Sequence, residues 1–242
     1  MKILVLTSIY PSNDATKGTT PVVHYFCNEW VKLGHEVLVV HNDNKYLLFF
    51  YLLPKFIKNF ITSKFGVILP NIAMRKTKLF KMDNVKVLRM PILKIIPFGK
   101  FSNYQLNRQL DKIKIFLEEE DFIPDVITGH WENPQIDLIF ELKKCYTNAK
   151  TSVVIHVTKY IDNIDLRTKI LSFDSIGFRN KTLLNKFVED YKIKYSNLYT
   201  CYSGLPENFF ESINYDFVGS KFEEEILSIV YVGLFLKRKY PE

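Results

Sequence analysis

Short apolar segments rich in β-branched residues alternate with amphipathic helical patterns along most of this chain. Several of these segments are apolar on both faces, as in parallel strands that helices cover on each side. The segments expected to form strands are 2–7, 36–41, 85–90, 125–130, 152–157, 172–177 and 198–202. The helical patterns cover 21–33, 103–120, 134–145 and 181–194. Such an alternation predicts an α/β fold in which an open parallel sheet carries helices on both faces.

The first expected helix is the best specified of these elements. Thr20 can cap it, and Pro21 suits its first position because proline has a fixed φ and no amide hydrogen to lose. Gly34 ends the helix, and His35 is interpreted as a turn residue before the next strand. One apolar stripe is expected to face the sheet, formed by Val22, Val23, Phe26, Cys27, Trp30 and Val31.

The last segment begins the same kind of unit a second time. Residues 226–242 read ILSIVYVGLFLKRKYPE, which is an apolar strand, a glycine and a basic loop. The polar residues 206–225 before it contain no Gly/Ser-rich tether and predict a short, ordered junction. We therefore expect one domain over residues 1–205, a junction over 206–225, and the first strand and loop of a truncated second domain over 226–242. On this interpretation the chain is one half of a two-domain enzyme.

Composition narrows the classes of function. The formal net charge of +7 would suit nucleic acid, phosphate-bearing small molecules or an anionic membrane surface. Acidic clusters such as 118–121 and 223–225 interrupt the basic residues, and no nucleic-acid-binding motif accompanies them, so nucleic acid is not expected as a partner. No apolar run approaches the ~20 residues that span a bilayer.

The cysteines point to a reducing compartment. Cys27, Cys145 and Cys201 are odd in number and widely spaced, which argues against a disulfide framework or a zinc site. The expected location is therefore the cytoplasm.

The loop over residues 10–20 joins the first strand to the first helix, and ligands bind at such loops in open α/β sheets. Free helix amide groups attract phosphate there, and Gly18 would let the backbone approach a ligand closely. The loop matches neither a GxGxxG nor a Walker motif, so Gly18 could equally be a simple turn residue.

Residues 125–134 read DVITGHWENP and deliver His130, Trp131 and Glu132 to the carboxyl end of a strand. These three residues are predicted to bind the acceptor: a sugar could stack on the indole ring and form hydrogen bonds with its polar neighbours. In the alternative interpretation Trp131 packs under the sheet and His130 caps the following helix.

His156 ends the next apolar strand, within SVVIHVT. It could contact a ligand or carry a proton in a cleft, or it could be a buried core histidine. No Ser-His-Asp set, paired glutamates or His-carboxylate metal cluster is visible, so hydrolase and metalloenzyme functions are poorly supported.

Residues 46–64, YLLFFYLLPKFIKNFITSK, combine apolar bulk with Lys55, Lys58 and Lys64. They could lie in a membrane interface with the lysines towards lipid phosphates, which would place the protein peripherally on the inner face of the plasma membrane. The alternative is a core helix that is broken at Pro54.

Taken in order, several segments resemble family 4 of the retaining GT-B glycosyltransferases, especially bacterial enzymes of surface-polysaccharide synthesis. The matching segments are MKILVLTSIYPS, KGTTPVVHYF, WVKLGHEVLVVH, PDVITGHWENPQ, SVVIH, SIGFRNKTLLNKF, CYSGLPENFF and IVYVGLFLKRKYPE. The resemblance covers nearly the whole chain, with residues 46–81 matched least. It implies a Rossmann-like N-terminal acceptor-binding domain, followed by the start of a domain that binds a nucleotide-sugar donor, with no metal or other cofactor.

The resemblance also implies roles for individual residues. Gly18 matches a loop glycine that faces the donor phosphates, His156 matches a histidine near the reacting sugar, and Lys239 matches a lysine that binds the donor diphosphate. Val157 stands where many members have glycine. Leu234 stands where an arginine often shares the diphosphate, and Arg238 could partly substitute for it.

Two hypotheses remain open. In the first, the chain is the acceptor-binding part of a glycosyltransferase that acts on a polysaccharide or glycolipid acceptor, inactive alone and completed by a separate C-terminal half. In the second, it is a non-catalytic binding module of the same fold that docks on a partner. A nucleotide-sugar epimerase is a more distant alternative.

Overall fold

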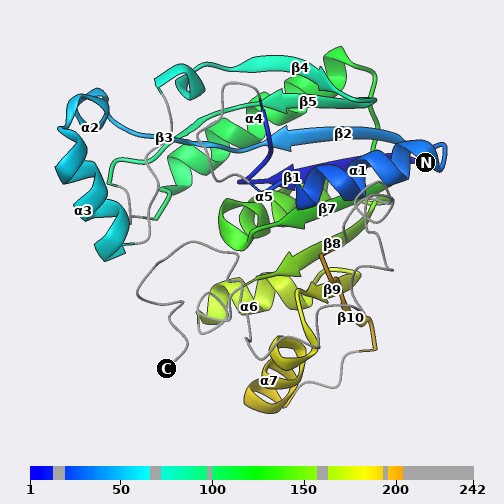
Figure 1. The fold of residues 1–242 in the computed structure, drawn as a ribbon. Coiled ribbons are helices and arrows are strands. Elements are labelled where there is room, and N and C mark those ends of the chain that lie inside the picture. The colour runs from blue at the N-terminus through cyan, green and yellow to red at the C-terminus, as the bar shows by residue number, and fades with distance from the viewer. Residues whose placement is uncertain (13–19, 66–71, 97–99, 157–162, 193–195, 204–242) are drawn as a thin grey trace, which may run out of the picture.

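The computed structural model describes residues 1–12, 20–65, 72–96, 100–156, 163–192 and 196–203. Its centre is an eight-stranded sheet in the order β10-β9-β8-β7-β1-β2-β5-β4 (Figure 1). The strands of this sheet are β1 (Lys2–Thr7), β2 (Glu36–His41), β4 (Lys78–Met82), β5 (Val85–Arg89), β7 (Val126–His130), β8 (Lys150–Ile155), β9 (Ser175–Phe178) and β10 (Leu198–Thr200). The helices of eight or more residues are α1 (Val22–Lys32), α3 (Lys55–Phe65), α4 (Asn103–Glu119), α5 (Glu132–Cys145), α6 (Ile164–Leu171) and α7 (Lys181–Tyr191).

The sheet is open and almost entirely parallel, which confirms the predicted fold class. β1 pairs with β2 on one side and with β7 on the other, in parallel register on both. The exception is β4, which the sequence did not predict and which pairs antiparallel with β5. Strand order reverses beside β1, so the point between β1 and β7 is where ligands bind in open α/β sheets.

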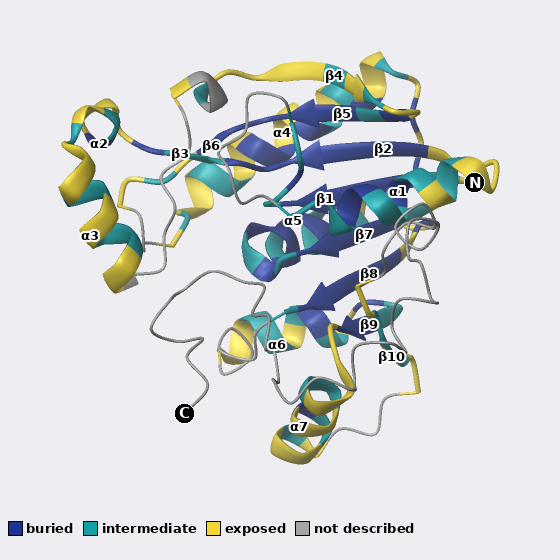
Figure 2. Ribbon diagram, in the orientation of Figure 1, coloured by how far each residue is buried: buried dark blue, intermediate teal, exposed yellow. Residues whose placement is uncertain are grey.

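Alternate residues of β1, β2 and β5 face two separate cores, and Figure 2 shows the buried strands between the helices. Leu4 and Leu6 of β1 face a core that also contains buried residues of α4, α5, α6 and α7. Ile3 and Val5 of the same strand face a core that includes Val23 and Cys27 of α1. Helices therefore cover both faces of the sheet.

The start of α1 differs from the prediction. Pro21 is the N-cap residue rather than the first helical residue, and Thr20 precedes the cap, with its Oγ1 3.5 Å from the amide of Val22. The buried side of α1 also includes His24, which the apolar stripe did not contain. Its Nδ1 lies 2.8 Å from the Tyr10 hydroxyl and its Nε2 lies 2.7 Å from a carboxylate oxygen of Asp83. Gly34 has a φ of 84°, which explains glycine at the helix end.

Other element boundaries match the prediction or shift by a few residues, for local reasons. α4 begins at the predicted residue because Ser102 and Gln105 form a capping box. α7 ends before Lys192, which has a left-handed conformation with a φ of 50°. β9 begins at Ser175 rather than at 172, because Lys143 of α5 donates to the Ser172 carbonyl and the Thr151 amide of β8 donates to the Asp174 carboxylate.

Residues 42–65, together with residues 92–93, form a small subdomain after β2. The two-stranded sheet of β3 (Asn44–Lys45) and β6 (Ile92–Leu93) leads into α2 (Leu48–Leu52), and Pro54 separates α2 from α3. The predicted break at Pro54 is therefore present. However, α3 contains no residue described as buried, so this segment is not a core helix. The predicted junction 206–225 and the final segment 226–242 lie outside the described residues.

Candidate functional site

Parallel pairing brings the carboxyl ends of β7 and β8 side by side. His130, the last residue of β7, is opposite Val154 of β8 on one side and Thr7 of β1 on the other. His156 follows directly on the last residue of β8. His130, Trp131, Glu132 and His156 thus meet at one edge of the sheet, next to the point where strand order reverses.

Aromatic contacts join these residues into one cluster. The rings of Trp131 and His156 are stacked, with centroids 4.0 Å apart and an interplanar angle of 15°. The centroids of His130 and His156 lie 6.2 Å apart, and Phe26 of α1 stacks on His130 at 5.8 Å. His130 is buried, whereas Trp131 and His156 are half-buried. His130 therefore packs against the buried side of the cluster and does not cap α5. Trp131 occupies the N-cap position of α5, without a side-chain capping bond.

Glu132 connects the two strand ends. Its carboxylate accepts a hydrogen bond from the backbone N–H of His156, and its side chain is buried at the first residue of α5. Asn133 has a non-helical φ of −109° and ψ of 123°, so the regular part of α5 begins at Pro134, as predicted, and Glu132 lies just before it. A carboxylate close to the N-terminus of a helix is favoured because the helix dipole is positive there. Glu132 therefore fixes the backbone of His156 rather than offering its carboxylate to solvent.

Trp131 has an unusual backbone conformation. Its φ of 70° is rare for a bulky residue and costs on the order of 1–3 kcal/mol. Gln135, which is fully buried, donates hydrogen bonds to the Trp131 carbonyl at 2.8 Å and to the Ser8 hydroxyl at 2.6 Å. Strain of this kind is common at functional sites, where the surrounding structure holds it in place.

The bonds that hold Trp131 extend through four elements. Asn42, just after β2, donates to the Gln135 side-chain carbonyl at 3.2 Å, and Gln109 of α4 donates to the Asn42 side-chain carbonyl at 2.8 Å. Ser8, just after β1, donates to the Asn133 carbonyl at 2.9 Å and so bridges the reversal point. Sequence interpretation missed these residues, although Ser8 and Asn42 are polar residues that directly follow strands.

Gly129 explains how closely α5 approaches the cluster. A Cβ atom at this position would lie 2.6 Å from Cδ1 of Ile139 and 3.1 Å from Cβ of Gln135. A larger residue in β7 would therefore push α5 away and move Gln135 from the Trp131 carbonyl.

The site histidines are electrostatically neutral near pH 7. Burial, with a further contribution from His156, lowers the pKa of His130 to about 3. Burial, with a further contribution from Arg179, lowers the pKa of His156 to about 4. Both ring nitrogens of His156 and Nε1 of Trp131 are buried without a hydrogen-bond partner among the described residues. A neutral imidazole and an indole can offer two donors and one acceptor, so this pair is suited to a ligand that both donates and accepts hydrogen bonds.

We expect these histidines to make the fold sensitive to acid. An unfolded imidazole has a pKa of about 6.5, so below that pH the unfolded state takes up protons that the folded state excludes. The free energy of unfolding should fall as pH drops, by at most about 1.4 kcal/mol per pH unit for each histidine, until the folded pKa is reached. Urea titrations of the parent and of His156→Phe between about pH 7 and pH 5 measure the difference in slope. An identical slope in both proteins would contradict the lowered pKa of His156.

The other predicted site residues lie elsewhere. Gly18, Arg238 and Lys239 lie outside the described residues. Among those described, no group of three or more His, Cys, Asp or Glu residues could hold a metal ion. A cavity of about 550 Å³ is lined by residues including Glu36, Leu79 and Phe122, but it lies at the amino end of β2, away from the histidine cluster.

Comparison with known proteins gave matches only at the level of solved structures. No protein-family model matches the chain, and no curated protein matches it. The UDP-GlcNAc 2-epimerase from Methanocaldococcus jannaschii is 10% identical, with a TM-score of 0.44 over 83% of this chain and 45% of that chain. Arabidopsis thaliana UGT89C1, solved in complex with UDP-L-rhamnose, is 16% identical, with a TM-score of 0.38 over 85% of this chain and 49% of that chain. The chain therefore spans about half the length of these structures, and its fold assignment rests on the strand order and helix layers described above.

Proposed function

We propose that the chain is the acceptor-binding part of a GT-B glycosyltransferase resembling family 4, which moves a sugar from a nucleotide-sugar donor to a surface-polysaccharide or lipid-linked acceptor. The observation that carries this proposal is the stacked pair of Trp131 and His156 at the carboxyl ends of β7 and β8. Both side chains have buried polar atoms without partners among the described residues, beside the reversal point where open α/β sheets bind ligands.

The chemistry of this pair suits a sugar. Sugars present hydroxyl groups that donate and accept hydrogen bonds, together with apolar C–H surfaces that pack on aromatic rings. Neutral His156 and the Trp131 indole match both features without a charged group. In the proposed reaction His156 hydrogen-bonds the transferring sugar as charge develops on it, and Glu132 and Gln135 position the pair through the contacts described above.

The donor is proposed to be held largely by other parts of the enzyme. By resemblance, Gly18, Arg238 and Lys239 would contact the donor diphosphate, and a donor-binding domain, in this polypeptide or a separate one, would hold the nucleotide. Fixed cationic and amide groups can supply the charge stabilisation, so no metal or other cofactor is proposed.

Tryptophan fluorescence tests the proposal at the site itself. The chain has two tryptophans, so Trp30→Phe leaves Trp131 as the reporter. Titration of this variant with UDP- and GDP-sugars and with oligosaccharides should produce a saturable change in emission, because a bound sugar would alter the surroundings of the indole. His156→Ala in the same background should weaken that response. The matched control is Trp131→Phe, which retains Trp30 on α1 and should give no response.

The outcomes separate the hypotheses. Absence of any response from Trp131 to every sugar, in a folded protein, would mean that the pair is packing and would contradict the proposal. Saturable binding without sugar transfer, even when a donor-binding domain is supplied, would favour the non-catalytic binding module.

A further inference from the structure

The outer sides of α2 and α3 expose large apolar side chains. Phe49 is 53% exposed, Leu52 75%, Phe56 72% and Phe60 58%. Phe56 and Phe60 are four residues apart and therefore lie on one side of α3. We call the set of Leu48, Phe49, Leu52, Phe56 and Phe60 the α2–α3 surface; Figure 2 shows much of these two helices as exposed.

Packing on the inner side holds this surface in place. Phe50 is buried in α2, and its ring centroid lies 6.1 Å from that of the buried Tyr46. The Tyr51 hydroxyl accepts a hydrogen bond from the Tyr46 amide at 3.1 Å. Lys58 of α3 donates a hydrogen bond to the Tyr51 carbonyl at 2.8 Å. The apolar side chains are thus presented outward by helices that contact each other and the subdomain beneath them.

The charge of the chain is concentrated around the same segment. The chain has 33 Lys and Arg residues and 26 Asp and Glu residues. Residues 44–82 contain eight of the Lys and Arg residues and none of the Asp and Glu residues. The remainder of the chain carries 25 basic and 26 acidic residues, so this segment accounts for the entire positive net charge. The basic residues of the segment are Lys45, Lys55, Lys58, Lys64, Arg75, Lys76, Lys78 and Lys81.

Basic groups also border the α2–α3 surface in space. Lys55 and Lys64 are exposed on α3, and the Lys64 ammonium lies 5.4 Å from the Phe60 ring centroid. The pairing of β3 with β6 continues as a hydrogen bond from the Lys94 amide to the Lys45 carbonyl at 2.7 Å, so the exposed Ile95 and Ile96 lie near the start of α2. Burial lowers the pKa of Lys112, and smaller contributions from Arg108 and Lys45 show that these three cations lie near one another.

We propose that the α2–α3 surface docks on an anionic membrane. Its phenylalanine and leucine side chains would enter the headgroup region, while the surrounding lysines contact lipid phosphates. An exposed apolar row beside lysines, in a segment without any carboxylate, is complementary to an anionic lipid surface. Among the described residues no helix is long and apolar enough to cross a membrane. In the proposed docking α3 would lie along the interface.

The position of the surface has a consequence for the histidine cluster. α2 and α3 lie beyond the carboxyl ends of the strands, on the same side of the sheet as the edge that carries His156 (Figure 1). Docking through α2 and α3 therefore places that edge towards the lipid, where a lipid-linked molecule could reach it. The docking itself rests on exposure and charge alone and does not depend on the proposed glycosyltransferase function.

Vesicle sedimentation with the full chain tests the proposal. The protein should bind vesicles of equal parts phosphatidylglycerol and phosphatidylcholine, bind pure phosphatidylcholine much more weakly, and dissociate as salt rises. Phe56→Gln with Phe60→Gln should weaken binding about tenfold or more, because two exposed rings no longer enter the interface. Lys55→Gln should weaken it about fivefold, as expected for one lysine near an anionic surface.

Matched controls are available elsewhere on the surface. Leu33→Gln with Ile164→Gln changes two exposed apolar residues away from α2 and α3, and Lys181→Gln changes an exposed lysine of α7; neither should alter binding. Circular dichroism should show unchanged folding in every variant, since all the altered side chains are exposed.

Equal binding to neutral and anionic vesicles, or none to either, would overturn the proposal. Concentration-dependent self-association that Phe56→Gln with Phe60→Gln abolishes, without vesicle binding, would overturn it and assign the surface to a second copy of the chain.

Discussion

His156→Ala is expected to lower kcat by ~10²-fold or more in the enzyme that contains this chain. The ring of His156 is stacked on Trp131, and its two nitrogens have no partner among the described residues. A hydrogen bond to the reacting sugar that strengthens as charge develops would be lost with the ring, while binding of the ground state would change less. The effect should therefore appear mainly in kcat and only weakly in KM.

The measurement is sugar transfer from a nucleotide-sugar donor, with the donor-binding domain present. His156→Gln keeps a donor and an acceptor near the same position and should recover part of the lost rate. His35→Ala, at the turn before the amino end of β2, is the matched histidine control and should leave kcat unchanged. Unchanged turnover in a folded His156→Ala protein would return His156 to the alternative role of a core histidine.

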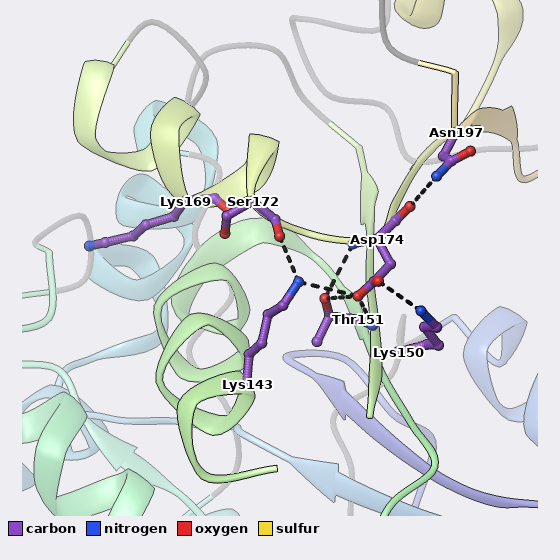
Figure 3. Close-up of polar contacts among 7 residues, drawn as sticks. All are labelled: Lys143, Lys150, Thr151, Lys169, Ser172, Asp174 and Asn197. Carbon is purple, nitrogen blue, oxygen red and sulfur yellow. Dashed lines mark hydrogen bonds and ion pairs between the residues drawn. The ribbon is translucent and has the colours of Figure 1, made fainter. Parts of the chain in front are cut away.

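Asp174→Ala is expected to lower the free energy of unfolding by roughly 2 kcal/mol at neutral pH. The Asp174 carboxylate accepts hydrogen bonds from the Thr151 amide at 2.9 Å and the Thr151 hydroxyl at 2.8 Å (Figure 3). The Lys143 ammonium lies 3.2 Å from the same carboxylate, and the Lys150 ammonium lies 3.4 Å from it. The variant leaves the Thr151 donors without this acceptor, and partial exposure of the ion pairs keeps the expected loss below that of a fully buried pair.

The effect of Asp174→Ala should depend on pH. Burial raises the pKa of Asp174, but hydrogen bonds from Thr151 and the Lys143 ammonium outweigh it and hold the pKa below its ordinary value. A depressed pKa in the folded state means that the stabilisation is complete above the unfolded pKa of about 3.9 and is lost as pH falls below it.

Urea denaturation at neutral pH and at about pH 3 measures both effects. Asp111→Ala is the matched control, because its carboxylate is exposed and only 3.5 Å from Lys114 within the same helix, and it should change stability by less than about 0.5 kcal/mol. The same loss for Asp174→Ala at both pH values would contradict the role of the ionised carboxylate.

Local patterning predicted most of the sheet. β1 and β2 match their predicted ranges because their residues are apolar on both faces and are bounded by polar or turn residues. β4 was missed because Lys78–Met82 contains two lysines and is largely exposed, so its pattern resembles a loop; it is the last strand of the sheet in the part of the chain that the structure describes. Only the antiparallel pairing with β5 makes these residues a strand.

The candidate site divides in a similar way. Sequence order alone placed His130, Trp131 and Glu132 after one strand and His156 after the next, since strand ends can be predicted from apolar runs that stop. The sequence could not distinguish exposed from buried members. In the structure His130 and Glu132 are buried, whereas Trp131 and His156 are half-buried.

The sequence by itself determined the fold class of this protein and the identity of the residues at the strand ends, because hydrophobic periodicity is a local property of the chain. The tertiary structure alone decided that Trp131 stacks on His156, that Gln135 holds the strained Trp131 backbone, and that Phe56 and Phe60 face outward. These features depend on strand order, helix placement and burial. Such relations join residues far apart in the chain, and no local pattern encodes them.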